Sequence, residues 1–148
     1  VGTELKELGF NGQLNIELKT DIIQYEGLVE KCLALQSTNA WPFTIVYSSF
    51  NPYTLVELKQ ANPSQEIGLL FESKEWANKG DAMLEKESYH PDLKLLDWTL
   101  EWNTNQLPLR VWTVNKDEDM NRCFELQIEA IFTDYPGKAL QLKENYER

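Results

Sequence analysis

The features that most readily assign a function are scarce in this sequence. Its 148 residues include two cysteines, one histidine and seven glycines. There is no Cys-x-x-Cys spacing and no histidine cluster, which excludes the common zinc sites, and the few glycines form neither a dinucleotide-binding fingerprint nor a P-loop. We expect Cys32 and Cys123 to be buried, reduced thiols, as suits a reducing compartment; a disulfide between them is the alternative.

Positive charge is also scarce. The chain has 14 basic against 24 acidic residues, which gives a net charge of −10. Because such a chain repels phosphate backbones and anionic lipid surfaces, we expect no nucleic-acid partner. No apolar run approaches the ~20 residues of a membrane helix, so we expect no membrane span. The lack of a leader peptide favours a cytoplasmic location, but the chain starts without methionine, and we expect its true N-terminus to lie elsewhere.

The residues that are present indicate one globular domain of alternating strands and helices. Hydrophobic residues make up 42% of the chain and aromatic residues 11%. Six strands are expected, at Gln13–Lys19, Phe43–Phe50, Ile67–Phe71, Ser88–His90, Leu109–Asn115 and Ala130–Asp134. The helical patterns are Thr3–Leu8, Glu26–Gln36, Pro52–Ala61, Glu75–Lys86, Asp92–Asn103, Asp117–Leu126 and Gly137–Asn145.

This alternation predicts an α/β fold with a parallel sheet. Repeated βα units form either an open doubly wound sheet or a closed barrel, and the open sheet lacks its nucleotide-binding signature here. We therefore predict a (β/α)8 fold of TIM-barrel type. Because that fold needs ~250 residues and eight strands, the six βα units of this chain are expected to form an incomplete barrel.

An acid and a base stand two residues apart in the first predicted strand. Glu17 and Lys19 fall on one face of that strand, and Ile16 and Leu18 fall on the other. Polar side chains on a buried parallel strand gather at its carboxyl end, where ligands bind. A solvent-facing ion pair on an edge strand is the alternative.

Polar and aromatic motifs at the predicted strand ends, taken together and in this order, resemble a known family. They are Asn15-Ile16-Glu17-Leu18-Lys19, Ser49-Phe50-Asn51-Pro52, Gly68-Leu69-Leu70-Phe71, His90-Pro91, Val111-Trp112-Thr113-Val114-Asn115 and Ile131-Phe132-Thr133-Asp134-Tyr135-Pro136. The chain resembles the later part of a glycerophosphodiester phosphodiesterase, a metal-dependent hydrolase built on a (β/α)8 barrel.

The resemblance implies a role for four residues. Glu17 would be one of three carboxylates that bind a divalent cation, Mg²⁺ or Ca²⁺. Lys19 would face the phosphodiester and offset its developing negative charge. Trp112 would form an apolar wall for the glycerol end of the substrate, with Phe50 on the other side of the pocket; packing within the barrel is the alternative for Trp112.

Three further polar residues are expected to have structural roles. Asn51 is expected to cap the helix that begins at Pro52. His90, which precedes a proline, is expected to be a structural or peripheral pocket residue. For Asp134 we expect a cap on the last helix.

The chain also departs from the family pattern. The family's His-Arg-Gly strand, Glu-x-Asp strand and His-Asp pair are absent, and its two-histidine acid–base chemistry cannot be performed by a chain with one histidine. No catalytic residue is therefore expected in this chain. Residues 1–148 are interpreted as the C-terminal portion of a single TIM-barrel phosphodiesterase domain, whose complete form hydrolyses glycerophosphodiesters to glycerol 3-phosphate and an alcohol.

Other functional interpretations stay open. The chain could be a non-catalytic barrel fragment or pseudoenzyme that acts as an interaction module through uncovered aromatic faces such as Trp98 and Trp102. A phospholipase D-like toxin on the same barrel is a lesser enzyme alternative. In either case we expect the unpaired edge strands of the incomplete barrel to pair with a second copy of the chain, as a homo-oligomer, or with a complementing N-terminal segment.

Overall fold

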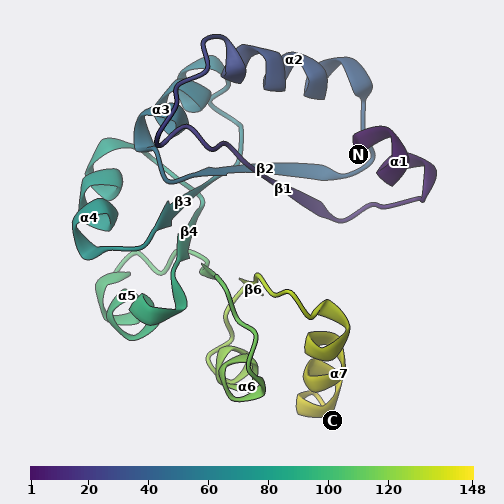
Figure 1. Cartoon of the computed structure of the whole chain (residues 1–148), viewed down its shortest axis with the longest axis vertical. Helices are drawn as coiled ribbons and strands as arrows, with labels where there is room; N and C mark the ends of the chain where they lie inside the picture. The colour runs from purple at the N-terminus through teal and green to yellow at the C-terminus, as the bar shows by residue number, and fades with distance from the viewer. The chain divides into compact units, whose positions relative to one another are not determined.

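The computed structural model describes all residues from Val1 to Arg148 and contains every predicted strand and helix (Figure 1). The strands are β1 (Gln13–Glu17), β2 (Thr44–Ser49), β3 (Ile67–Phe71), β4 (Ser88–Pro91), β5 (Arg110–Val111) and β6 (Ala130–Ile131). The helices are α1 (Gly2–Glu7), α2 (Leu28–Asn39), α3 (Pro52–Ala61), α4 (Lys74–Met83), the 3₁₀ helix η1 (Leu93–Leu95), α5 (Leu96–Trp102), α6 (Asp117–Glu125) and α7 (Pro136–Tyr146).

The chain divides into two compact units. Unit 1 comprises Val1–Leu69 and Lys79–Lys86, and unit 2 comprises Leu70–Asn78 and Glu87–Arg148. Strand β3 and helix α4 are each divided between the two units. We therefore describe each unit by itself.

In unit 1 the strands pair in parallel and in chain order. Glu17 of β1 is opposite Ser48 of β2, and Ser48 is opposite Gly68 of β3. Figure 1 shows β1 and β2 as the longest pair, with α2 alongside. The hydroxyl of Tyr47 in β2 donates a hydrogen bond to the Cys32 carbonyl of α2, at 3.3 Å. Every residue of β3 is buried, as expected for a strand of a parallel sheet that is covered on both faces.

The predicted N-cap of α3 is confirmed. The Asn51 side chain accepts a hydrogen bond from the Tyr53 amide at 3.0 Å, and Pro52 occupies the first turn, where its missing N–H costs nothing. The Asn51 amide also donates to the Thr20 carbonyl at 2.9 Å. This one side chain therefore starts α3 and fastens the loop that follows β1.

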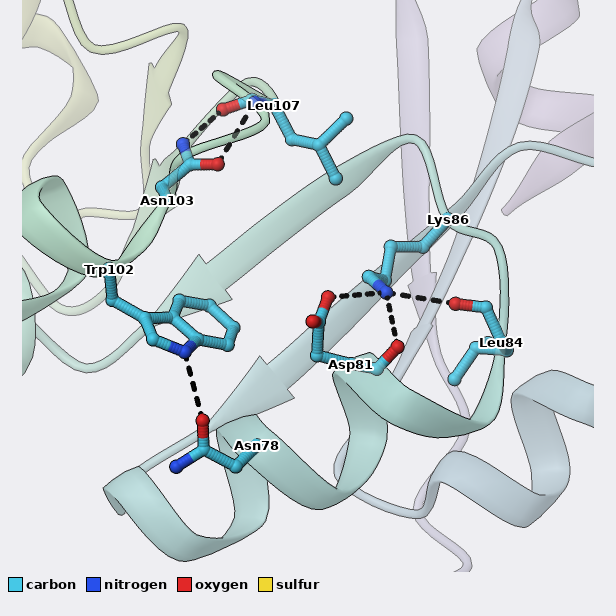
Figure 2. Close-up of polar contacts among 7 residues, drawn as sticks. All are labelled: Asn78, Asp81, Leu84, Lys86, Trp102, Asn103 and Leu107. Carbon is cyan, nitrogen blue, oxygen red and sulfur yellow. Dashed lines mark hydrogen bonds and ion pairs between the residues drawn. The ribbon is translucent and has the colours of Figure 1, made fainter.

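Helix α4 ends earlier than predicted, at Met83 instead of Lys86. The nearly buried Lys86 ammonium lies 2.7 Å from the Asp81 carboxylate and donates to the carbonyls of Asp81 and Leu84 at 3.0 and 2.8 Å (Figure 2). A cation at a helix C-terminus satisfies carbonyls that have no partner within the helix. Lys86 thus closes the helix from outside instead of extending it.

In unit 2 the strand pairs are also parallel. The Asp92 amide, just after β4, donates to the Phe71 carbonyl at the end of β3, at 3.0 Å. Parallel bridges join Tyr89 to Leu109 and Asp92 to Trp112, and β5 pairs with β6 in parallel. The prediction of parallel strands that are neighbours in chain order therefore holds for these pairs.

The strands beyond β4 are shorter than predicted. The run Leu109–Asn115 contains the two-residue β5, and Ala130–Asp134 contains the two-residue β6. Backbone bonding nevertheless continues past their ends, because the Val114 amide donates to the Phe132 carbonyl at 2.8 Å. The remaining residues leave the sheet and carry the polar side chains of the βα loops.

The predicted helix Asp92–Asn103 is split into η1 and α5. Leu96 and Thr99 are its buried residues, and the half-buried Trp98 and Trp102 stack at 5.0 Å and both lie edge-on to Phe71. The Trp102 indole N–H also donates to the Asn78 side chain at 2.9 Å (Figure 2). The interaction-module alternative placed these tryptophans on an uncovered face, but both are half-buried and pack against aromatic rings of unit 2.

Both cysteines are free thiols, as predicted. Cys123 is fully buried, and burial raises its pKa to about 11, whereas Cys32 is half-buried. No helix is both long and apolar enough to cross a bilayer.

Candidate functional site

The carboxyl end of β1 presents Glu17 and Lys19 to solvent. Both side chains are exposed, whereas Leu18 and Thr20 between and after them are buried, so the predicted two-faced pattern is present. Lys19 lies just beyond the strand, which ends at Glu17 instead of at the predicted Lys19. Neither side chain forms a hydrogen bond or an ion pair. The alternative of a surface ion pair between them is therefore not observed.

Buried serines of β2 hold this end of β1 in place. The Ser49 hydroxyl donates to the Leu18 carbonyl at 2.7 Å and accepts from the Asn51 amide at 3.1 Å. The Asn15 side chain of β1 donates to the hydroxyl of the preceding serine, the fully buried Ser48, at 3.1 Å. These contacts fix the backbone on which Glu17 is carried. Sequence reasoning did not assign Asn15 this role, although the residue opens the segment Asn15-Ile16-Glu17-Leu18-Lys19 that carries the resemblance.

Phe50 directly follows β2 and is half-buried. Because β1 and β2 are parallel and Glu17 is opposite Ser48, the backbones of Phe50 and of Glu17 and Lys19 leave the sheet at the same end of unit 1. Unit 1 thus brings three of the four predicted site residues, Glu17, Lys19 and Phe50, to the same end of its parallel sheet.

Trp112, the fourth predicted site residue, lies in unit 2 just after β5. Its indole N–H donates to the His90 carbonyl at 2.7 Å, and its own carbonyl accepts from the Leu93 amide at 2.7 Å. The ring is half-buried and its orientation is fixed by that indole bond. A fixed, partly open aromatic ring suits an apolar pocket wall.

His90 is buried completely and has a structural environment. Its Nε2 shares a hydrogen bond with the Ser88 hydroxyl at 3.0 Å, its Nδ1 has no hydrogen-bond partner, and its ring packs against Phe132. Burial, followed by the nearby Arg110 cation, lowers the pKa of His90 to about 3. The imidazole is therefore neutral at physiological pH, and it is shut off from solvent.

Asp134 does not cap the last helix, so that prediction is wrong. The carboxylate of Asp134 instead accepts from the Asn115 side-chain amide at 2.8 Å, while the Asn115 oxygen accepts from the Asp134 amide at 3.0 Å. Thr133 does not cap that helix either, because its hydroxyl accepts from the amide of Tyr135, the residue before the helix begins at Pro136, at 3.1 Å. The Asn115 side chain thereby connects its own loop, which follows β5, to the loop that follows β6.

The residues of this chain supply part of a metal site at most. No group of three His, Cys, Asp or Glu side chains is placed to hold a metal ion. Glu17 fits a single oxygen ligand for a hard cation, because its carboxylate is exposed, has no partner and is carried by the last residue of a strand that is paired with β2. The other ligands that such an ion requires are not gathered around it in this chain.

Comparison with known proteins identifies the family. A model of the glycerophosphoryl diester phosphodiesterase family matches residues 3–138. A glycerophosphodiester phosphodiesterase of Caldanaerobacter subterraneus is 31% identical over 134 residues, which cover 87% of this chain and 54% of that protein. The chain spans about half the length of the curated relatives it matches.

Solved structures agree on the fold. A structure from Galdieria sulphuraria matches 96% of this chain and 61% of its own, with a TM-score of 0.79 and 22% identity. An Oleispira antarctica phosphodiesterase, solved in complex with sn-glycerol-3-phosphate, matches 89% of this chain and 55% of its own, with a TM-score of 0.69 and 22% identity. These structures are of TIM-barrel type, which confirms the predicted fold class; a closed barrel is not present in this chain. With six βα units and a family match over nearly its whole length, the chain belongs to the glycerophosphoryl diester phosphodiesterase family.

Proposed function

We propose that this chain is the C-terminal portion of an enzyme that hydrolyses glycerophosphodiesters to glycerol 3-phosphate and an alcohol. The observation that carries the proposal is the Glu17-x-Lys19 end of β1, where an acid and a base share one exposed face without neutralising each other. A pair that served only stability would be expected to bond together or to other groups. Two unpartnered charges of opposite sign suit a site for a cation and an anionic group.

Glu17 would provide one oxygen ligand to a divalent cation, Mg²⁺ or Ca²⁺, with the remaining ligands supplied by parts of the enzyme that this chain lacks. When bound, such an ion would supply positive charge to a phosphoryl oxygen. Lys19 would face the same phosphodiester and offset the negative charge that develops on it. The serine contacts beneath them would preserve the spacing of the two groups.

Phe50 and Trp112 would line the glycerol end of the substrate pocket. Phe50 follows the strand next to Glu17, and Trp112 has an indole held by the His90 carbonyl. Apolar rings exclude water from a phosphoryl site and so strengthen the electrostatic contacts within it.

The chain has no group for acid–base catalysis of the kind expected of the family. Its one histidine, His90, is buried and neutral, and its Nε2 is engaged by Ser88. We therefore propose that this chain alone is inactive and that the complete enzyme supplies the acid and base. The alternative, a non-catalytic interaction module, is an outcome of the experiment below.

The proposal is tested in the complete protein by changing Glu17 and Lys19 separately. Glu17→Gln removes one anionic ligand, so turnover of glycerophosphocholine should fall to a small fraction and recover in part when the metal concentration is raised. Lys19→Ala should cost about 2.7–4 kcal/mol of transition-state stabilisation, as for the loss of one preorganised donor, with the dependence on metal unchanged.

Two exposed residues of α5 and η1 provide matched controls. Glu101→Gln and Lys94→Ala make the same chemical changes at exposed positions to which the proposal gives no role and should leave turnover unchanged. Full activity of Glu17→Gln at the ordinary metal level would show that β1 does not hold the metal. A complete protein without turnover on any glycerophosphodiester would favour the interaction module.

A further inference from the structure

A buried cation in unit 2 has no part in the proposed mechanism. Arg110 of β5 is only 7% exposed, whereas the other two arginines of the chain, Arg122 and Arg148, are exposed. Burial of a permanent charge costs free energy, so arginine is mostly found at protein surfaces. The charge of Arg110 is therefore a candidate for a role beyond packing.

The Arg110 side chain lies on the face of the unit 2 strands that α5 does not cover. Tyr89 of β4 is paired in parallel with Leu109, so the next pair along the two strands is His90 and Arg110. The Tyr89 ring packs on Trp102 of α5, with centroids 4.8 Å apart, which marks the Tyr89 face as the one covered by the helix. Successive side chains of a strand point to opposite faces, so His90 and Arg110 share the other face.

The same face carries Trp112, the proposed wall of the substrate pocket. Trp112 comes two residues after Arg110, and Phe132 comes two residues after Ala130, which is paired with Arg110. The Phe132 ring contacts the His90 ring, with centroids 5.6 Å apart, which agrees with one shared face. Because a strand rises about 3.3 Å per residue, the backbones of Arg110 and Trp112 are about 7 Å apart.

The charge of Arg110 acts on this face. Burial is the first cause that lowers the pKa of His90 to about 3, and the Arg110 cation is the second. The residues opposite Arg110 on the two neighbouring strands, the neutral His90 and Ala130, carry no negative charge. A guanidinium stays protonated at every physiological pH, and salt screens a buried charge only weakly. The protein beneath Trp112 therefore holds a fixed positive charge.

We propose that Arg110 is a specificity-determining residue, which strengthens the binding of phosphate anions beside Trp112 without touching them and favours doubly charged phosphomonoesters over singly charged diesters. This inference rests on the proposed function, because it takes Trp112 as a wall of the substrate pocket. Coulomb energy is proportional to the charge of the ligand, so a dianion gains twice the free energy that a monoanion gains. At a separation of about 10 Å and an effective dielectric constant of about 20, each ligand charge is worth about a tenfold change in affinity.

The test uses the complete protein with Arg110→Met, which keeps a long side chain and removes its charge. At pH 8 glycerophosphoglycerol carries one negative charge and glycerol 3-phosphate carries two. The KM of the diester should rise about three- to tenfold, and the Ki of glycerol 3-phosphate as a competitive inhibitor should rise by about the square of that factor. A defect of packing alone would weaken both ligands by similar factors. Arg110→Lys keeps the charge and should keep most of both affinities.

Arg122→Met is the matched control, because it removes the same charge from an exposed position of α6 in the same unit. It should leave both constants unchanged. Equal factors for the two ligands in Arg110→Met, an equal loss in Arg122→Met, or an Arg110→Lys variant as weak as Arg110→Met would each overturn the inference. If far-UV circular dichroism shows that Arg110→Met does not fold, Arg110→Gln takes its place.

Failure of this inference is distinguishable from failure of the proposed function. If the complete protein hydrolyses glycerophosphodiesters and Arg110→Met leaves both constants unchanged, the role of Arg110 alone is overturned. If the complete protein has no turnover, the proposed function fails, and calorimetric titration with glycerol 3-phosphate decides the role of Arg110. Binding that Arg110→Met weakens would then support that role, whereas unchanged or absent binding would overturn it.

Discussion

A single buried histidine gives this chain a simple dependence of stability on pH. In the folded state burial lowers the pKa of His90 to about 3, whereas an unfolded histidine titrates near 6.5. Between these values the unfolded chain binds a proton that the folded chain does not. The contribution of His90 to stability is therefore fully present above pH 6.5 and is lost as the pH falls towards 3.

We predict that the free energy of unfolding decreases by about 1 kcal/mol between pH 7 and pH 5.5, since a group unprotonated in the folded state opposes folding as the pH falls below 6.5. Urea unfolding of the chain at the two pH values measures the change. In His90→Gln the chain has no histidine left to titrate, so the difference between the two pH values should disappear, whatever the overall stability of the variant. A wild-type chain that is equally stable at both values would mean that folding does not lower the pKa of His90.

Residue roles that depend on strand periodicity were predictable, and roles that depend on a distant partner were not. The shared face of Glu17 and Lys19 follows from alternation along β1. Asp134 was misassigned because its carboxylate is taken by Asn115, 19 residues earlier in the chain. A helix-start pattern reports what a side chain can do locally, but it does not show a competing donor that comes from another strand.

At the scale of single elements, helix α4 contains a glycine that packing requires. A glycine inside a helix ordinarily costs about 1 kcal/mol relative to alanine. At Gly80, however, an added Cβ would lie 2.7 Å from Cδ1 and Cδ2 of Leu69, which is itself almost fully buried in β3. The close approach of α4 to β3 therefore depends on the absence of a side chain.

We predict opposite effects for the same substitution in two helices. Gly80→Ala should destabilise the chain by about 1–3 kcal/mol, because overpacking against Leu69 exceeds the gain in helix propensity. Gly137→Ala in α7 should be neutral or stabilising by up to about 1 kcal/mol, since no atom lies within 4 Å of its added Cβ. The midpoints of urea unfolding measure the change in stability of the two variants. Destabilisation of equal size in both would contradict the packing argument.

The element boundaries show where pattern reasoning ends. The leucine spacing predicted one helix over Asp92–Asn103, yet the segment is split into η1 and α5. Of its leucines, Leu96 is buried but Leu100 is 38% exposed, and the two tryptophans are half-buried. The position of Asn51 before Pro52 predicted the start of α3 correctly, because a cap acts on its own helix. Local signals therefore located the helix start, whereas the packing of Trp102 was decided by aromatic partners from β3 and β4.

At the scale of the whole molecule, the rhythm of strands and helices was sufficient to predict parallel pairing in chain order. Short βα connections make successive strands neighbours, and the pairs of β1 with β2 and of β5 with β6 follow this rule. The alternation of strands and helices does not, however, provide a neighbouring strand for the outer edges of the sheets. Strand β1 bonds only to β2 and β6 only to β5, so each strand has one side without a neighbour.

Such edges are templates for association. In β6 the amides on either side of Ile131 bond to β5, since Ala130 donates to the Leu109 carbonyl and Phe132 to the Val111 carbonyl. Amides alternate in direction along a strand, so the Ile131 N–H points to the open side. A proline at position 131 would remove this donor without breaking a ladder bond.

We predict that the chain self-associates at micromolar concentrations unless a segment that supplies the neighbouring strands is present, and that Ile131→Pro shifts it towards monomer. Sedimentation velocity over a hundredfold range of concentration measures both effects. Ile22→Ser is the control, because Ile22 is 90% exposed in the loop after β1 and its loss removes apolar surface without altering a strand edge. A monomeric wild-type chain across the range would contradict the edge argument, and a larger effect of Ile22→Ser would assign association to loop hydrophobicity instead. If Ile131→Pro alone restores the monomer, the backbone of β6, and not its side chains, drives the association.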